Sequence, residues 1–142
     1  MVSSGHIKIS GCPNGCGQHH ISSIGFQGSV RKVGGKAIPQ YFVLVGGGCA
    51  DDGTAYFGKV VSKVPVHRMN EVVERLVKMY DQQHQPDEDL GAFFRRVPPA
   101  AATEALKDLA LLLPNEITEQ DYVDLGETQA FNPEVMDGEC AV

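Results

Sequence analysis

The hydrophobic pattern of the chain changes its period near residue 67, and this change limits the folds open to it. Before residue 67, apolar residues alternate with polar ones or form short runs, the clearest at 41–45 between Pro39 and a glycine triplet. Such patterns are typical of β-strands. After it, apolar residues recur at helical spacing from Met69 to Tyr80. The sequence therefore predicts an α+β domain, a small mixed or antiparallel sheet with helices packed on one face.

Weaker signals extend this order of elements. Strands are expected at 6–10, 21–30 and 56–66, with a hairpin turn at 33–36. Helices are expected around Phe93 with Asp87 as the cap, over 101–113, and for one turn after Thr118, whereas 126–142 carries no period.

The charged residues divide the chain into a mildly basic front and a strongly acidic tail. Of 18 acidic and 12 basic side chains, ten acids but only Lys107 among the bases follow residue 97, where Pro98 and Pro99 interrupt the helical pattern. We therefore expect one domain over 1–97 and an acidic, partly helical tail over 98–142. The basic front favours anionic substrates or a polycarboxylate cofactor. A tail that is merely solvated is an equal alternative to one with a function.

The chain carries no sign of a membrane segment or a secretory signal. No apolar run approaches the roughly 20 residues needed to cross a bilayer. The first residues lack a basic region followed by an apolar one. We expect a cytoplasmic protein with reduced thiols and with neither a membrane nor a nucleic acid as a partner.

Two of the four cysteines, Cys12 and Cys16, lie four positions apart in a turn that directly follows the first predicted strand. Taken alone, this spacing fits part of a zinc site, a thiol redox pair or no metal function at all. The turn also contains Gly11, Gly15 and Gly17. Glycines allow backbone amides to face sulfur atoms and allow a flat cofactor to approach closely. The setting therefore favours an iron–sulfur cluster but leaves the other readings open.

The stretch 10–28 reads SGCPNGCGQHHISSIGFQG, and it resembles the second cysteine motif of the sirohaem-containing nitrite and sulfite reductases. The likeness continues through 41–48 and the helix at 68–80, so that it covers about residues 5–97. The resemblance implies an oxidoreductase with an electron-transfer centre. It also implies the fold of the C-terminal portion of a nitrite/sulfite reductase 4Fe-4S domain.

In that family two cysteine pairs hold a [4Fe-4S] cluster, and the last cysteine of the second pair also bridges to the sirohaem iron. Carried onto this sequence, the resemblance implies that Cys12 and Cys16 are metal ligands and that Cys16 is the bridge. Contacts to the cofactors are expected from Asn14, Gly15, Cys16, Gln18 and His19. The implied reaction is the six-electron reduction of sulfite to sulfide or of nitrite to ammonia. No catalytic residue is identified in this chain.

The first cysteine pair of the family has no counterpart here, because only eleven residues precede Cys12 and neither Cys49 nor Cys140 has the required spacing. A cubane cluster normally takes four thiolates. We therefore expect both cofactors to need the remaining part of the reductase, with an electron donor and a small anion as further partners. The isolated chain should be inactive. The alternatives are a non-catalytic assembly module, for example a homodimer that shares a cluster, and a thiol redox protein.

Overall fold

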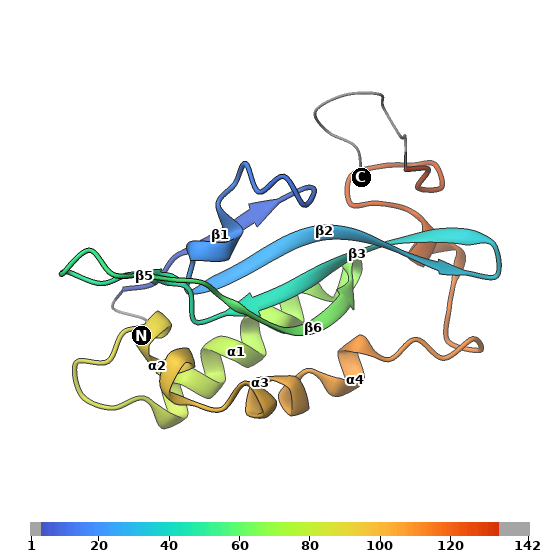
Figure 1. The fold of residues 1–142 in the computed structure, drawn as a ribbon. Helices are drawn as coiled ribbons and strands as arrows, with labels where there is room; N and C mark the ends of the chain where they lie inside the picture. The colour runs from blue at the N-terminus through green and yellow to red at the C-terminus, as the bar shows by residue number, and fades with distance from the viewer. Residues whose placement is uncertain (1–3, 134–142) are drawn as a thin grey trace.

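The computed structural model describes residues 4–133, which form a β-sheet covered by helices on one face (Figure 1). The four strands of the sheet, in spatial order, are β1 (Ile7–Ser10), β2 (Ile24–Val33), β3 (Lys36–Val45) and β6 (Lys59–Pro65). β1 is parallel to β2, and the other two pairs are antiparallel. A separate pair joins β4 (Gly48–Cys49) to β5 (Ala55–Tyr56). The predicted small mixed sheet is confirmed.

β2 and β3 form a hairpin that is longer than the sequence predicts. The predicted turn at 33–36 is confirmed, with Gly34 and Gly35 at φ values of 59° and 78°. Positive φ at both central positions suits the twist of a two-residue hairpin. The strands extend to either side of this turn because backbone pairing continues through polar residues that hydrophobicity does not mark.

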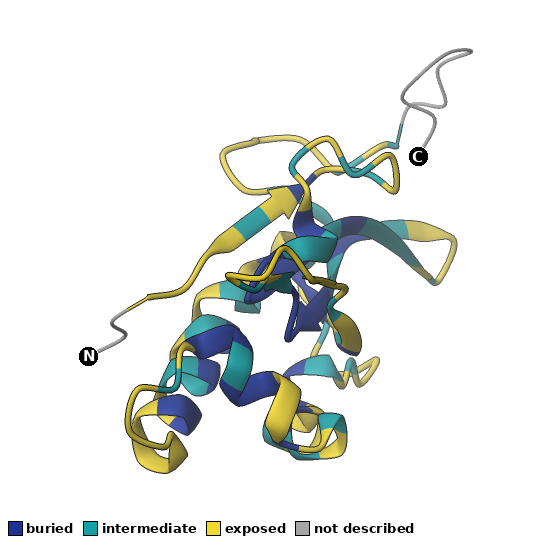
Figure 2. Cartoon of the chain, turned by 60° about the vertical axis from the view of Figure 1, so that its left-hand side comes forward, coloured by how far each residue is buried: buried dark blue, intermediate teal, exposed yellow. Residues whose placement is uncertain are grey.

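The helices follow the strands and cover one face of the sheet, as predicted. They are η2 (Val66–Arg68), α1 (Met69–Gln83), α2 (Leu90–Arg96), α3 (Pro99–Ala105) and α4 (Lys107–Ala110). The core lies between the two layers, where Phe26 and Val43 from the sheet meet Leu76 and Phe93 from the helices. Figure 2 shows these buried segments, in dark blue, between the sheet and the helices.

Two predicted helix boundaries are wrong. The cap of α2 is Asp89 rather than Asp87, since Asp89 Oδ1 accepts a hydrogen bond from Ala92 N at 2.8 Å. Asp87 instead occupies a left-handed turn position with φ of 61°. The predicted helix over 101–113 begins earlier, at Pro99, where its missing N–H costs nothing.

The same helix is also interrupted and shortened. The fully buried Leu106 leaves helical geometry, with φ of −106° and ψ of 1°, and separates α3 from α4. α4 ends at Ala110, and arginines from other elements donate to carbonyls at this end and just beyond it. Arg68 Nη1 donates to Leu109 O and Leu111 O at 2.9 and 2.8 Å, and Arg31 Nη1 donates to Ala110 O at 3.1 Å.

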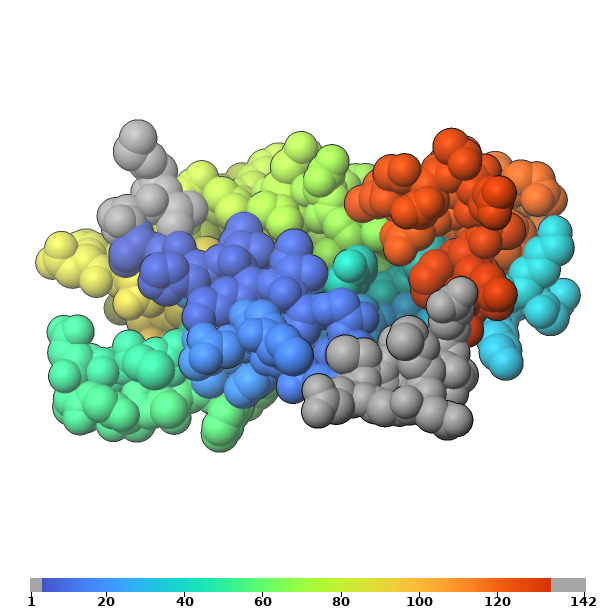
Figure 3. Space-filling view, turned by 90° about the horizontal axis from the view of Figure 1, so that it is seen from above, coloured from blue at the N-terminus to red at the C-terminus, as the bar shows by residue number. Residues whose placement is uncertain are grey.

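The segment after α4 folds back beside the β2–β3 hairpin. The predicted turn after Thr118 is confirmed as η3 (Glu119–Tyr122), with Thr118 and Asp121 forming a reciprocal capping box. Val123 then pairs with Ala130 across a single antiparallel bridge. Figure 3 shows this segment, in orange and red, beside the cyan tip of the hairpin.

Residues on both sides of Pro98 contribute to one hydrophobic core. Ala102, Leu106 and Leu109 belong to the same buried cluster as Val61 of β6. The division into 1–97 and 98–142 stays a prediction. The last part of the predicted irregular stretch, 134–142, lies outside the described residues, as does Cys140. Within residues 4–133 no helix is long and apolar enough to cross a membrane.

Candidate functional site

The cysteine pair lies in the loop 11–18, which leaves β1 and enters the short helix η1 (His19–Ile21). Figure 1 shows this loop above the sheet, on the side opposite the helices. Two turns shape it: Gly15 N donates to Cys12 O at 3.4 Å, and Gln18 N donates to Gly15 O at 2.7 Å. Cys12 is half-buried and Cys16 is exposed. Both thiols therefore belong to one surface loop whose backbone is folded on itself.

Left-handed backbone geometry is needed at two places in the loop. Gly15, between the cysteines, has φ of 70°, a value that glycine adopts without strain. Gln18 has φ of 56°, and its Oε1 accepts a hydrogen bond from Lys8 Nζ at 3.2 Å. The loop is thus tied to β1 by a side chain at its end. Asn14, at the tip of the turn, is exposed.

A buried hydrogen-bond network holds the loop from behind. His19 is only 4% exposed, and both of its ring nitrogens have partners. Its Nδ1 lies 2.8 Å from Ser10 Oγ, and its Nε2 lies 3.2 Å from Gln27 Oε1. Gly17 N donates to the same Ser10 Oγ at 3.0 Å. The network therefore links β1, β2 and the residue that follows Cys16.

The partners determine the proton positions in this network. Because Gln27 Oε1 is an acceptor, His19 Nε2 carries the ring proton, and Nδ1 accepts from the Ser10 hydroxyl. Ser10 Oγ remains free to accept from Gly17 N–H. Burial lowers the pKa of His19, as does the nearby His20, while the hydrogen bond to Gln27 opposes this. The neutral imidazole thus satisfies every member of the network.

His20 contacts the loop from its other flank. Its ring is stacked on Phe57 with centroids 5.7 Å apart, and it meets the His19 ring edge-on at 5.4 Å. A side-chain carbon placed at Gly15 would lie 3.5 Å from the His20 ring and 3.6 Å from that of His19. Gly58 N donates to His20 O at 2.7 Å. The two imidazoles therefore form the wall behind the turn between the cysteines.

Close packing also fixes the end of the loop. A methyl group at Gly17 would lie 2.0 Å from Ile9 O, and one at Gly25 would lie 2.1 Å from His19 O. Real carbon–oxygen contacts do not reach such distances, so only glycine permits the chain to pass here. The path of the loop over β1 and β2 depends on these two positions.

The loop offers two thiolates and no more. Cys49 belongs to β4 and is exposed, and no group of three or more histidine, cysteine or acidic residues able to hold a metal exists among residues 4–133. A [4Fe-4S] cluster takes four thiolates, so the described donor set fits half of such a site. Sulfur ligands suit iron–sulfur chemistry.

The structure places the predicted site residues in two groups. Cys12, Asn14, Gly15, Cys16 and Gln18 belong to the loop itself, whereas His19 lies behind it with both ring nitrogens occupied. The sequence reasoning missed Ser10, Gln27 and Phe57. Ser10 carried one signal, because a hydroxyl at the last inward position of a strand needs a partner.

Comparison with known proteins identifies relatives for most of the chain. Residues 6–100 match the family described as the nitrite and sulphite reductase 4Fe-4S domain. The chain is 30% identical over 104 residues to the sulfite reductase [NADPH] hemoprotein beta-component of Chromohalobacter salexigens, covering 70% of this chain and 16% of that protein. It is 27% identical over 133 residues to the assimilatory ferredoxin-dependent nitrite reductase of Haloferax mediterranei, covering 93% and 21%.

A solved structure has the same fold. The Mycobacterium tuberculosis NirA protein aligns with a TM-score of 0.60 and 23% identity, over 70% of this chain and 18% of that one. The chain thus spans about a fifth or less of the length of the proteins it matches.

Proposed function

Because this chain belongs to the nitrite and sulphite reductase 4Fe-4S domain family, we propose that it supplies half of the cluster ligands of a larger reductase. Cys12 and Cys16 are the ligands, and Cys16 is shared with the iron of a sirohaem. The remaining part of the reductase supplies the other two thiolates. The observation that carries this proposal is a two-thiol loop at the surface with no third ligand among the described residues.

The hydrogen bonds that hold the base of the loop support a ligand role over an idle turn. The thiols belong to a surface loop, while its base is held by Ser10, His19 and Gly17. A metal site gains affinity when its ligands are preorganised by hydrogen bonds from behind. His19 then acts as a positioning residue, since its ring nitrogens already bond to Ser10 and Gln27. Asn14, Gly15 and Gln18 remain proposed contacts to the cofactors.

When bound, the paired cofactors would supply single electrons for the reduction of a small oxyanion, sulfite or nitrite. The residues of this chain bind, position and shield that centre. Gly15 supplies the left-handed turn between the cysteines, and the His19 and His20 rings lie against that turn. An electron donor docks to the assembled enzyme. The isolated chain, with half of the ligands, is inactive.

Cysteine variants of the assembled protein test this role. The chain is purified without oxygen together with the polypeptide that carries the first cysteine pair, as wild type, Cys12→Ser, Cys16→Ser and Cys49→Ser. Iron, acid-labile sulfide and the visible spectrum are measured. We expect Cys12→Ser and Cys16→Ser to lower cluster content, and Cys49→Ser, the exposed control, to match the wild type.

Cys16→Ser should also alter the sirohaem spectrum directly. Cys12→Ser should change that spectrum only as a consequence of cluster loss. Full cluster content in both Cys12→Ser and Cys16→Ser would contradict the proposed function. Four thiolates from two copies of this chain would instead appear as an iron-loaded homodimer without any companion polypeptide, which is the assembly-module alternative.

A further inference from the structure

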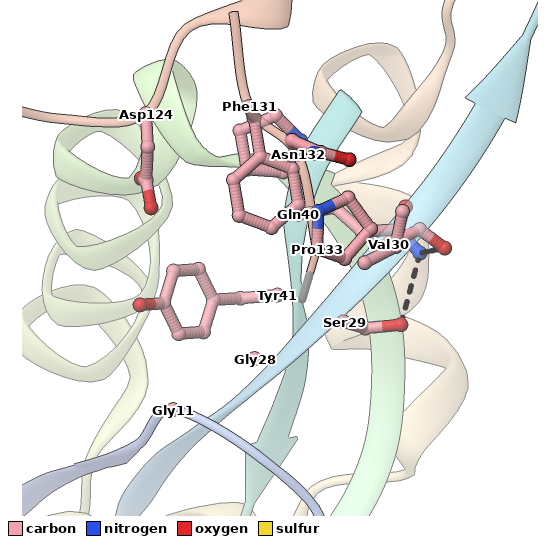
Figure 4. Close-up of a pocket in the computed structure, with 11 residues that line it drawn as sticks. Gly11, Gly28, Ser29, Val30, Gln40, Tyr41, Asp124, Phe131, Asn132 and Pro133 are labelled. Carbon is pink, nitrogen blue, oxygen red and sulfur yellow. Dashed lines mark hydrogen bonds between the residues drawn. The ribbon is translucent and has the colours of Figure 1, made fainter. Parts of the chain in front are cut away.

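The C-terminal segment and the sheet border an open cavity whose lining includes Gly11, the first residue of the cysteine loop, but neither cysteine. It has a volume of about 300 Å³ and lies between residues 124–133 and the middle of β2 and β3 (Figure 4). Gly11 and Gly28 form a floor without side chains, and Tyr41 and Phe131 contribute aromatic rings. Because neither cysteine lines the cavity, it is a candidate site distinct from the pair of proposed metal ligands.

The segment that closes the cavity is held in place by contacts of several kinds. Phe131 N donates to Tyr122 O at 2.5 Å, and Val123 pairs with Ala130. Val123 O also lies 2.7 Å from His67 Nε2. The cavity wall is therefore part of the folded structure rather than a chance contact of a loose end.

The charge of the cavity is negative. Asp124 is the one acidic side chain in its lining, which contains no lysine, arginine or histidine. A second cavity, of about 440 Å³, shares Asp124, Phe131 and Asn132 and adds the carboxylate of Glu127. Small anions such as sulfite are therefore disfavoured here, and a cation is favoured.

The nearby basic side chains are engaged elsewhere. Lys36 pairs with Glu119 at 3.7 Å and lies 5.0 Å from the Tyr122 ring centre. Arg31 donates to Gln40 Oε1 and to the carbonyl of Ala110. In the part of the chain that the structure describes, Asp124 has no basic partner. Burial raises the pKa of Tyr41, and the charge of Asp124 raises it further, so this charge acts within the cavity.

Neutral polar side chains complete the lining. Figure 4 shows the Asp124 carboxylate directed toward the Tyr41 side of the cavity, with Phe131 and Asn132 along the opposite wall. Gln40, which is only 5% exposed, bonds Ser29 Oγ through its Nε2 at 3.4 Å. A half-buried carboxylate beside two aromatic rings suits a flat cation, which can pair with the former and stack on the latter.

We propose that this cavity is a binding site for a guanidinium group, held by the Asp124 carboxylate against the Tyr41 and Phe131 rings. Guanidinium is planar and forms paired hydrogen bonds to carboxylates, whereas an ammonium group is a compact, strongly hydrated charge. The group belongs either to a free small molecule or to an arginine side chain of another polypeptide. Neither Cys12 nor Cys16 lines this site.

Titration of the full chain with ethylguanidinium, followed by amide ¹H–¹⁵N NMR, tests the proposal. We expect saturable shifts centred on Gly11, Gly28 and Asn132. Asp124→Asn keeps the shape of the side chain and should weaken binding by about tenfold or more. Glu116→Gln removes a charge from the same acidic segment outside the cavity and should leave binding unchanged.

Further titrations test the chemistry and the source of the guanidinium group. Phe131→Leu should weaken binding by about threefold through loss of the ring face. Ethylammonium should bind more weakly than ethylguanidinium. A blocked tripeptide with a central arginine that binds more tightly than ethylguanidinium points to a protein source, and weaker binding points to a small molecule. Absent saturation, equal affinity for ethylammonium, or an unchanged affinity in Asp124→Asn would overturn the proposal.

Discussion

His19 Nδ1 lies 2.8 Å from Ser10 Oγ, and this contact joins the end of β1 to the turn that follows the cysteine loop. Through Ser10 the same network reaches Gly17 N at 3.0 Å, one residue after Cys16. The position of the second thiol therefore depends on a buried histidine that has no free nitrogen to offer a cofactor.

Removal of either partner of this contact should destabilise the fold. Ser10→Ala leaves the buried His19 Nδ1 without a partner, and His19→Phe leaves the Ser10 hydroxyl without its acceptor, each at a cost of about 1–3 kcal/mol. In the double variant the losses should be less than additive, because both substitutions break the same bond. Urea unfolding of the three variants gives the coupling. Ser62→Ala, at a half-buried hydroxyl in β6 without a hydrogen bond to another described residue, should cost less than about 0.5 kcal/mol.

The pH dependence of stability should report the neutral state of His19. Burial lowers its pKa below the ordinary 6.5, so the unfolded chain binds this proton more readily than the folded one. Its contribution to stability is therefore complete above pH 6.5 and declines as the pH falls through that value toward the lowered pKa. Unfolding at a series of pH values should show this decline in the wild type and a smaller one in His19→Gln. Identical profiles would contradict a neutral buried histidine.

Two glycines of the loop should respond differently to the same substitution. Gly17→Ala places a methyl group 2.0 Å from Ile9 O, so the backbone must shift, at a cost of about 1–3 kcal/mol. Gly11→Ala is the matched control, because a methyl group there meets nothing within 4 Å. Thermal unfolding should give Gly17→Ala a clearly lower melting temperature than Gly11→Ala. Equal melting temperatures would mean that the loop does not pass over β1 as described.

An ion pair that follows α1 in the sequence provides a second pH-dependent contribution to stability. Arg96 Nε and Nη2 bond both carboxylate oxygens of Glu88, at 2.6 and 2.8 Å, and these bonds hold the pKa of Glu88 at about 2. Because the folded state binds this proton less readily, the contribution is present above pH 4.5 and is lost as the pH falls toward 2. Glu88→Gln should flatten acid unfolding in this window. A profile that stays as steep as the wild type would show that other carboxylates dominate.

The sequence predicted the order of strands and helices because the spacing of apolar residues along the chain reflects which face of each element is buried. The strands of the sheet and α1 follow from this period, whereas the turn at Gly34-Gly35 follows from its paired glycines. The errors lie at helix ends that are contacted by residues distant in the sequence. α4 ends where Arg31 and Arg68 take its carbonyls, and neither arginine is near it in sequence.

The candidate site was predicted in part for the same reason. Cys12 and Cys16 are recognised from a contiguous motif, whereas the residues that support it are spread over three elements. Gln27 lies near His19 because the pairing of β2 with β1 places Gln27 opposite Ser10. Phe57 contacts His20 although the whole of β3 separates the two residues in the sequence. No spacing in the sequence marks such pairs.

The most direct test of the two-ligand account is the iron content of the wild-type chain, purified without oxygen alone and with the polypeptide that carries the first cysteine pair. The account predicts no stable cluster in the chain alone, and a cluster with a sirohaem spectrum in the joint preparation, because four thiolates are then present. A full cluster in the isolated chain, or a colourless protein in both preparations, would contradict it.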